Sequence, residues 1–225
     1  MGITKPEIEQ LLKENKHHQC KGGEVCVKTV AVADLPTRFG DFQIIAFYNN
    51  QDKKEHIALI HGDVCGKENV PVRIHSECLT GDAIGSLRCD CRDQLQQSLK
   101  QIAKMKNGVL FYLRQEGRGI GLINKIKAYQ LQDNGFDTIE ANKALGFKPD
   151  ERDYDVAAHM LRSLNIKSIK LMTNNPHKIN GLQKHRIKIT GRIPLIVKAN
   201  KHNKFYLETK RKKAGHLIEG LEQED

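Results

Sequence analysis

The chain has 225 residues, and its 37 lysines and arginines against 27 aspartates and glutamates give a formal net charge of +10. Its hydrophobic content of 39% is too high for wholesale disorder, and no apolar run reaches the ~18 residues of a membrane-spanning helix. The N-terminus lacks the apolar stretch of a signal peptide, so we expect a cytoplasmic protein with reduced cysteines and no contact with a membrane. The positive charge indicates an anionic partner, either nucleic acid or a small phosphorylated ligand, although a solvated lysine-rich surface explains it equally well.

We divide the chain into three parts. Residues 1–25 are an N-terminal extension, in which Thr4 and Glu7 have the spacing of a helix capping box. We expect residues 26–218 to form a single domain, and the acidic residues 219–225 to be a frayed C-terminal tail. In and beside the extension, four residues could bind a metal ion: His17, His18, Cys20 and Cys26. Their spacing fits no known pattern of metal ligands.

From about residue 27 onward, short apolar runs alternate with amphipathic segments. The strand-length runs, in chain order, are Val27–Ala33, Phe42–Tyr48, Ile57–His61, Pro71–His75, Val109–Leu113, Ile169–Met172 and Ile193–Val197. Apolar residues at helical spacing predict helices over Leu95–Met105, which stops near Asn107-Gly108, over Leu122–Asn134, which Gly135 caps, and over Val156–Leu164, with Asp153 available as N-cap. Strands alternate with helices, but the first four strands follow one another directly. We therefore predict an α/β domain with a mixed β-sheet flanked by helices.

Three cysteines form a Cys-x10-Cys-x-Cys set. Residues i and i+2 of an extended segment point the same way, so Cys89 and Cys91 can approach one ion, and Cys78 can close the site from a neighbouring segment. Zinc suits thiolates, and three protein ligands leave a fourth position for water, as in a catalytic site. A structural site would take a fourth ligand, for which Cys65 or His75 is available. Buried thiols without a metal are the third interpretation.

The segment Arg114–Gly121 follows a predicted strand and precedes a predicted helix, which is where an anion-binding loop is found. Gly117, Gly119 and Gly121 permit close approach of a ligand to the backbone. The spacing matches neither the dinucleotide fingerprint, which needs a glycine where Leu122 stands, nor a P-loop. A tight turn with solvated charges is the alternative.

The segment Asp150–Asp153 also precedes a predicted helix. Asp153 is explained as a cap, which leaves Asp150 and Arg152 as candidates for a polar role. Taken by itself, this segment is more typical of a charged loop.

Thr173–Lys178 follows a predicted strand, and Pro176 suits the first position of a helix. A hydroxyl, backbone amides and Lys178 would together suit a phosphate, although a capped turn is the commoner use of such a segment. The basic run Lys210–Lys213 has no interleaved aromatic residues, so it favours a solvated helix face over a nucleic-acid contact.

Five segments taken together resemble the GTP cyclohydrolase II family, and the resemblance extends from about residue 35 to about residue 218. The segments, in chain order, are Arg73–Asp82 (RIHSECLTGD), Ser86–Cys91 (SLRCDC), Leu113–Leu122 (LRQEGRGIGL), Asp150–Tyr154 (DERDY) and Leu171–Pro176 (LMTNNP). Five blocks in the expected order are far more specific than any one of them.

The resemblance implies that Cys78, Cys89 and Cys91 hold a catalytic zinc. It also implies that Asp150 is a proton acceptor, that Arg152 is a nucleophile and that Tyr129 lies beside the purine ring in the catalytic site. The residues that it implies around GTP are Arg73, Ile74, His75, Ser76, Glu77, Gln94, Glu116, Gly117, Arg118, Thr138, Thr173 and Lys178.

The implied reaction is the first step of riboflavin biosynthesis, in which the guanine imidazole ring of GTP is opened and formate and pyrophosphate are released. The resemblance implies magnesium for the part of the reaction that involves the phosphates of GTP. It also implies a homodimer and no nucleic-acid partner. On chemical grounds we interpret Arg152 as an electrostatic clamp on the α-phosphate with Asp150 orienting water, because a guanidinium stays protonated above pH 12. The N-terminal segment is too short for the dihydroxybutanone phosphate synthase domain that is often fused upstream.

The sequence departs from the family pattern at Arg92, where many members have glycine after the second cysteine of the Cys-x-Cys pair. A side chain there would alter the loop beside the zinc or add a positive charge near GTP. One alternative is an enzyme that stops at the formamidopyrimidine or uses another nucleotide, against which Tyr129 argues. Another is a basic nucleic-acid-binding or regulatory protein, which the net charge and the Lys210–Lys213 run would support.

Overall fold

The computed structural model describes residues 2–16, 25–52, 54–197, 199–200, 203–215 and 217. Of the sequence predictions, those for His17, His18, Cys20 and the tail 219–225 lie outside these residues. Within them, no helix is long and apolar enough to cross a membrane. Cys26 is disulfide-bonded, contrary to the expectation of reduced cysteines. Among the described residues, the free cysteines are Cys65, Cys78, Cys89 and Cys91.

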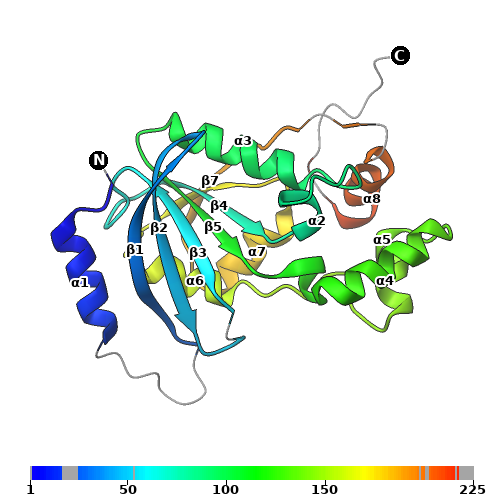
Figure 1. Ribbon diagram of the computed structural model, residues 1–225, viewed down its shortest axis with the longest axis horizontal. Coiled ribbons are helices and arrows are strands. Elements are labelled where there is room, and N and C mark those ends of the chain that lie inside the picture. The colour runs from blue at the N-terminus through cyan, green and yellow to red at the C-terminus, as the bar shows by residue number, and fades with distance from the viewer. Residues whose placement is uncertain are drawn as a thin grey trace.

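Seven strands form one sheet in the order β1-β2-β3-β5-β4-β6-β7 (Figure 1). Their bounds are β1 Val27–Thr37, β2 Gly40–Asn49, β3 His56–His61, β4 Val70–Ser76, β5 Gly108–Leu113, β6 Ile169–Met172 and β7 Ile189–Ile193. Three pairs of strands are antiparallel: β1 with β2, β2 with β3, and β3 with β5. The other three are parallel: β4 with β5, β4 with β6, and β6 with β7. The predicted mixed sheet is therefore confirmed.

The helices cover both faces of the sheet (Figure 1). Their bounds are α1 Lys5–Lys16, α2 Leu79–Asp82, α3 Cys91–Ala103, the short 3₁₀ helix η1 Glu116–Gly119, α4 Gly121–Asp133, α5 Thr138–Ala144, α6 Asp155–Ser163, α7 Pro176–Lys184 and α8 Lys204–Ala214. The main core lies under α6, and a smaller core lies under α3 on the opposite face. The central strand β5 is buried on both faces, which explains its unbroken apolar run.

Part of the N-terminal extension packs against the domain. Thr4 donates its backbone N–H and its hydroxyl to the carboxylate of Glu7, at 2.8 and 2.6 Å, as the capping-box spacing predicts. Ile3 and Leu11 are buried in the main core. The predicted division at residue 25 stays a prediction.

Most predicted elements occur within a few residues of their expected bounds, but the last predicted strand is wrong. We expected Ile193–Val197, whereas β7 is Ile189–Ile193. Its side chains alternate between half-buried and exposed, and Pro194, which has no N–H to donate, follows it directly. At the start of α6 the N-cap is Tyr154, and Asp153 instead accepts a hydrogen bond from the backbone N–H of Asp155.

Candidate active site

A cavity of about 350 Å³ lies beyond the carboxyl ends of the parallel strands β4, β5 and β6. Segments that directly follow these three strands line it, including Ser76–Cys78, Gln115–Arg118 and Thr173–Asn175. Parallel strands bring their carboxyl ends to one edge of a sheet, where ligands of α/β proteins bind. Segments that are far apart in the sequence therefore meet here.

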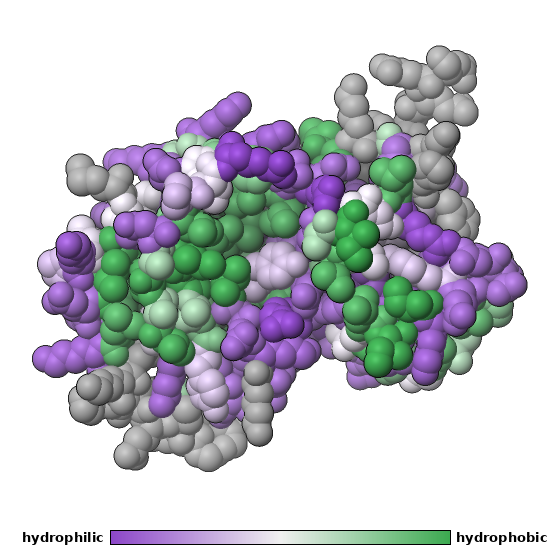
Figure 2. Space-filling model, in the orientation of Figure 1, coloured by the Kyte–Doolittle hydropathy of each residue, from purple (hydrophilic) through white to green (hydrophobic). Residues whose placement is uncertain are grey.

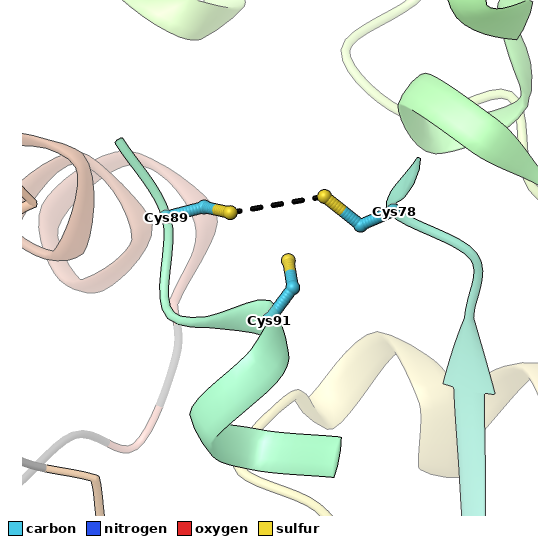
Figure 3. Close-up of side chains that lie close together, drawn as sticks. All are labelled: Cys78, Cys89 and Cys91. Atoms are coloured by element: carbon cyan, nitrogen blue, oxygen red, sulfur yellow. Dashed lines mark hydrogen bonds between the residues drawn. The ribbon is translucent and has the colours of Figure 1, made fainter. Parts of the chain in front are cut away.

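The three cysteines of the predicted metal set point their sulfur atoms toward one another in this cavity (Figure 3). Cys78 follows β4, Cys91 is the first residue of α3, and Cys89 lies in the loop before it. Their Sγ atoms all lie within 4.8 Å of one another, and those of Cys78 and Cys89 are 3.7 Å apart. Hydrogen bonds from Cys89, Cys91 and Lys125 hold the pKa of the Cys78 thiol well below its ordinary value.

The surroundings of the sulfurs fit a metal ion with three protein ligands. Among the described residues, neither Cys65 nor His75 belongs to the cluster, and Nε2 of His75 instead bonds Asp82 at 2.9 Å. A Cβ atom at Gly81 would lie 2.8 Å from Sγ of Cys89, so only glycine leaves room for the sulfurs. Three thiolates suit zinc and leave a position for water, which favours the catalytic over the structural interpretation.

A buried lysine contacts this cluster. Nζ of Lys125, from α4, lies 3.1 Å from Sγ of Cys78, 2.9 Å from Oγ1 of Thr80 and 2.7 Å from Oε1 of Glu116. Oε2 of Glu116 accepts a hydrogen bond from the backbone N–H of Leu79 at 2.6 Å. The Lys125–Glu116 pair therefore ties the loop after β5 to the first turn of α2 and gives one thiolate a cationic donor.

The glycine-rich segment after β5 forms a strained turn. Gly117 and Arg118 have φ values of +63° and +60°, which for arginine is an uncommon backbone conformation. A Cβ atom at Gly119 would lie 3.1 Å from the backbone of Glu151. The turn brings η1 against the segment before α6, where the backbone N–H of Glu151 donates to the carbonyl of Arg118 at 3.0 Å.

Arg152 and Lys178 are two further basic residues that line the cavity. Arg152 donates from Nε and Nη2 to both oxygens of Asp150, at 2.8 and 2.5 Å. Burial disfavours the charge of Arg152, but Tyr154 and Asp150 raise its pKa above the ordinary value. Burial lowers the pKa of Lys178, whose Nζ donates to the carbonyl of Ile74 at 2.7 Å.

The cavity wall carries more positive than negative side chains. Seven lysines and arginines line it, against four aspartates and glutamates. The cations are Arg73, Arg88, Arg118, Lys125, Arg152, Lys178 and Lys210. Such a lining suits a ligand with several negative charges, and the volume is that of a small-molecule site.

Comparison with known proteins agrees with the site. A model of the family described as GTP cyclohydrolase II matches residues 28–194. GTP cyclohydrolase-2 of Picrophilus torridus is 59% identical over 186 residues, which are 83% of this chain and 96% of that protein. The chain belongs to the GTP cyclohydrolase II family. Members of this family are hydrolases that act on GTP, so the enzyme class predicted from the sequence is confirmed.

Another relative is longer than this chain. Riboflavin biosynthesis protein RibBA of Endomicrobium trichonymphae is 54% identical over 195 residues, which are 87% of this chain and 48% of that protein. The chain therefore matches about half the length of that relative. Among solved structures, RibBX of A. baumannii, a two-domain 3,4-dihydroxy-2-butanone 4-phosphate synthase, is similar over 85% of this chain and 45% of that chain, with a TM-score of 0.42 and 16% identity.

The structure brings nearly all of the predicted site residues of this GTP cyclohydrolase II family member to one cavity. The exception is Ile74, whose side chain is fully buried and whose carbonyl holds Lys178. The predicted residues that line the cavity are Arg73, His75, Ser76, Glu77, Cys78, Cys89, Cys91, Gln94, Glu116, Gly117, Arg118, Tyr129, Thr138, Asp150, Arg152, Thr173 and Lys178.

Arg92, where the sequence departs from the family pattern, is absent from the cavity lining. Its guanidinium donates to the carbonyl oxygens of Asp82 and Ala83, at 3.3 and 2.6 Å. The side chain therefore holds the turn after α2 and adds no charge to the cavity wall.

Sequence reasoning missed two lysines of the cavity wall. Lys125 precedes Tyr129 by four residues on α4, and this spacing places both on one helix face, which is a signal that could have identified it. Lys210 was assigned to a solvated run, but it is buried against Asp90, which is 120 residues away in the sequence. No local pattern reports a contact of that kind.

Proposed function

We propose that the chain catalyses the zinc-dependent hydrolysis of GTP. The guanine imidazole ring is opened, formate and pyrophosphate are released, and the product is 2,5-diamino-6-(5-phosphoribosylamino)pyrimidin-4(3H)-one, in the first step of riboflavin biosynthesis. The observation that carries the proposal is the cluster of three cysteine sulfurs in a cavity lined mostly by cations, in a chain of this family.

Cys78, Cys89 and Cys91 would hold the zinc ion. When bound, zinc supplies a water of lowered pKa, hence a nucleophile at neutral pH, for attack on C8 of guanine. Three thiolates leave a zinc site with a net charge near −1, which opposes that acidification. The ammonium group of Lys125, 3.1 Å from the Cys78 sulfur, offsets part of this charge. Tyr129 lines the cavity next to the cluster, and its hydroxyl lies 3.3 Å from Oγ1 of Thr80, which suits contact with the purine ring.

Arg73, Arg152 and Lys178, which line the cavity, would hold the triphosphate. No carboxylate among the described residues lies within 4.0 Å of Lys178 Nζ, and Arg73 and Arg152 add further positive charge beside it. A bound phosphate group would supply the counter-charge that this buried lysine lacks. We place Mg²⁺ on the phosphate oxygens, where it would share their charge with these side chains.

Arg152 acts as a clamp on the α-phosphate rather than as a nucleophile. The bidentate bond with Asp150 and a raised pKa both favour the protonated guanidinium, which has no free lone pair for attack on phosphorus. Asp150 keeps a lowered pKa because its hydrogen bonds with Arg152 outweigh its burial. It therefore orients water as an ionised acceptor.

The two roles of Arg152 can be separated with GTP labelled at the α-phosphate. We expect no label on the protein after rapid acid quenching, and a reduced but measurable turnover in Arg152→Lys. Labelled protein in the wild type that is absent from Arg152→Lys would establish covalent attack and contradict the clamp.

We also propose that the enzyme is a cytoplasmic homodimer. Figure 2 shows hydrophobic residues over β1, β2 and β3 on the face that α3 covers only in part. In this open part, Ala31 and Ala33 are exposed, and the paired Ala46 and Ile44 are half-buried. A second copy that covers this face would remove the apolar surface from water.

Formate release tests the function directly. Purified protein with Mg²⁺ and GTP should release formate and pyrophosphate in equal amounts, lose this activity on removal of zinc by a chelator, and regain it on addition of zinc. Release of pyrophosphate without formate, or a formamidopyrimidine as final product, would contradict the proposed reaction. Salt-sensitive nucleic-acid binding by a folded, zinc-loaded sample without GTP turnover would favour a binding protein instead.

A further inference from the structure

Asp90 lies between two of the proposed zinc ligands, and its carboxylate is almost completely buried. The side chain is 3% exposed. Oδ1 accepts a hydrogen bond from Nζ of Lys210 at 2.7 Å, and Oδ2 accepts one from Nε2 of Gln94 at 2.5 Å. A carboxylate this deeply buried is stable only while both of its oxygens are paired. The conformation of the Cys89–Cys91 segment thus depends on these two partners.

Lys210 comes from α8, which lies outside the residues that match the family model. Its side chain is 9% exposed, and its Nζ lies 4.2 Å from the centroid of the Tyr206 ring, so an aromatic face as well as a carboxylate holds the charge. Tyr206 and Lys210 both line the cavity. Figure 1 shows α8 beside α2 and the first turn of α3, where the cysteines lie.

The same hydrogen bonds continue into the predicted GTP-binding residues. Oε1 of Gln94 accepts a hydrogen bond from Nη2 of Arg73 at 2.6 Å, and Nη1 of Arg73 donates to the carbonyl of Met172 at 3.0 Å. Lys210, Asp90, Gln94 and Arg73 therefore form one buried network of hydrogen bonds from α8 to the middle of β4 and the end of β6. Because Asp90 lies between Cys89 and Cys91 in the sequence, a shift of α8 would displace the sulfur atoms of these two cysteines.

We propose that Lys210 is a positioning residue for the zinc site: through its ion pair with Asp90, helix α8 fixes Cys89 and Cys91 in the orientation that binds the metal. The inference rests on the proposed zinc site, but not on turnover, because it concerns the affinity for the ion. Partners that orient metal ligands typically change affinity by ~10–100-fold when they are removed.

The test compares Lys210→Met with Lys212→Met. Lys212 lies on the same helix, is 65% exposed and forms an ion pair with Glu208 at 3.4 Å on the surface, so it controls for the loss of a lysine from α8. Zinc affinity is measured by competition with a chromophoric chelator, and ligand geometry by the absorption spectrum of the Co²⁺-substituted protein. We expect Lys210→Met to bind zinc about tenfold more weakly or worse with an altered Co²⁺ spectrum, Lys210→Arg to recover part of the loss, and Lys212→Met to match the wild type.

A folded Lys210→Met protein with wild-type zinc affinity and Co²⁺ spectrum would overturn the inference. If Lys210→Met fails to fold, the variant Asp90→Asn with Lys210→Met removes both buried charges together. We expect this double variant to fold and still to bind zinc weakly, and wild-type affinity in it would equally overturn the inference. Absence of zinc binding by the wild type would instead refute the proposed function.

Discussion

At Gly81 the missing side chain leaves the space that the cysteine sulfurs occupy. A Cβ atom there would lie 2.8 Å from Sγ of Cys89 and 3.1 Å from both Sγ of Cys78 and Cβ of Cys91. The sequence predicted the three cysteines as a possible metal set from their residue type and spacing, because zinc chemistry restricts both. It could not identify Gly81 or Lys125 as partners of the cluster, since their roles depend on distances that arise only after α2, α3 and α4 have packed.

Gly81→Ala should weaken zinc binding by about tenfold or more, because the methyl group forces the sulfurs apart. Gly81 lies in a helix without a positive φ, so alanine brings no backbone strain of its own. Chelator competition measures the affinity, and Gly191→Ala, where the added atom meets nothing closer than 3.8 Å, is the matched control. Wild-type affinity in Gly81→Ala would show that the sulfurs do not need this space.

Lys125→Met should lower both activity and stability, but for separable reasons. The variant leaves the buried Glu116 carboxylate without its cationic partner, which costs about 3 kcal/mol in the free energy of unfolding. It also removes the cation beside Cys78, and we expect formate release to fall by about tenfold or more.

Adding Glu116→Gln to Lys125→Met should restore most of the free energy of unfolding without restoring formate release, and Lys127→Met, exposed on the same helix, should affect neither. Chemical denaturation and the formate assay distinguish these effects. Recovery of turnover together with stability in the double variant would mean that Lys125 has only a structural role.

The secondary-structure elements differ in how far local sequence determines them. Strand β5 has an unbroken apolar run because it is buried on both faces, and Gly135 ends the α4 region with φ near +95°, so both could be predicted. Strand β7 was misplaced because its weak alternation contains Gly191 and Arg192, and it pairs only with β6. The contact of α8 with the segment from Cys89 to Cys91 could not be predicted. In the sequence the lysines of α8 resemble a solvated helix face, and only the folded structure shows Asp90 beside Lys210.

His56, the first residue of β3, should make the free energy of unfolding depend on pH. Burial lowers the pKa of His56 below its ordinary value, an effect that Asp52 only partly opposes, and Nδ1 of His56 accepts the backbone N–H of Arg114 at 3.1 Å. The unfolded chain, with a histidine pKa of ~6.5, therefore binds more protons than the folded one below about pH 7.

The free energy of unfolding should accordingly fall as the pH is lowered from about 7.5 through 6.5 toward the folded pKa, and His56→Asn should reduce the slope. Urea denaturation at a series of pH values measures both slopes. Equal slopes in the two proteins would mean that His56 contributes nothing to the pH dependence.

At the scale of the whole molecule, the parallel half of the sheet builds the site and the antiparallel half leaves an apolar face open. Strands β4, β5 and β6 gather residues from segments more than 90 positions apart into one cavity. The family resemblance carried by the five motifs implied this gathering, although nothing in their spacing gives the arrangement. Exposed Ala31 and Ala33 belong to the other half and carry no motif.

If this open face is the dimer interface, Ala33→Glu should convert the protein from a dimer into a 25.5 kDa monomer, because the carboxylate would be buried between two apolar sheets. Light scattering after size-exclusion chromatography measures the mass, and Lys188→Glu, 67% exposed before β7, is the control. If Ala33→Glu remains dimeric, the dimer interface lies elsewhere.

In the proposed site, three thiolates hold zinc with one coordination position open to the cavity. X-ray absorption at the zinc edge of the purified protein reports the atoms bound to the metal. We expect three sulfur atoms at ~2.3 Å from the zinc ion and one oxygen or nitrogen atom at ~2.0 Å. Four sulfur ligands, or a zinc ion bound only by oxygen and nitrogen, would contradict it.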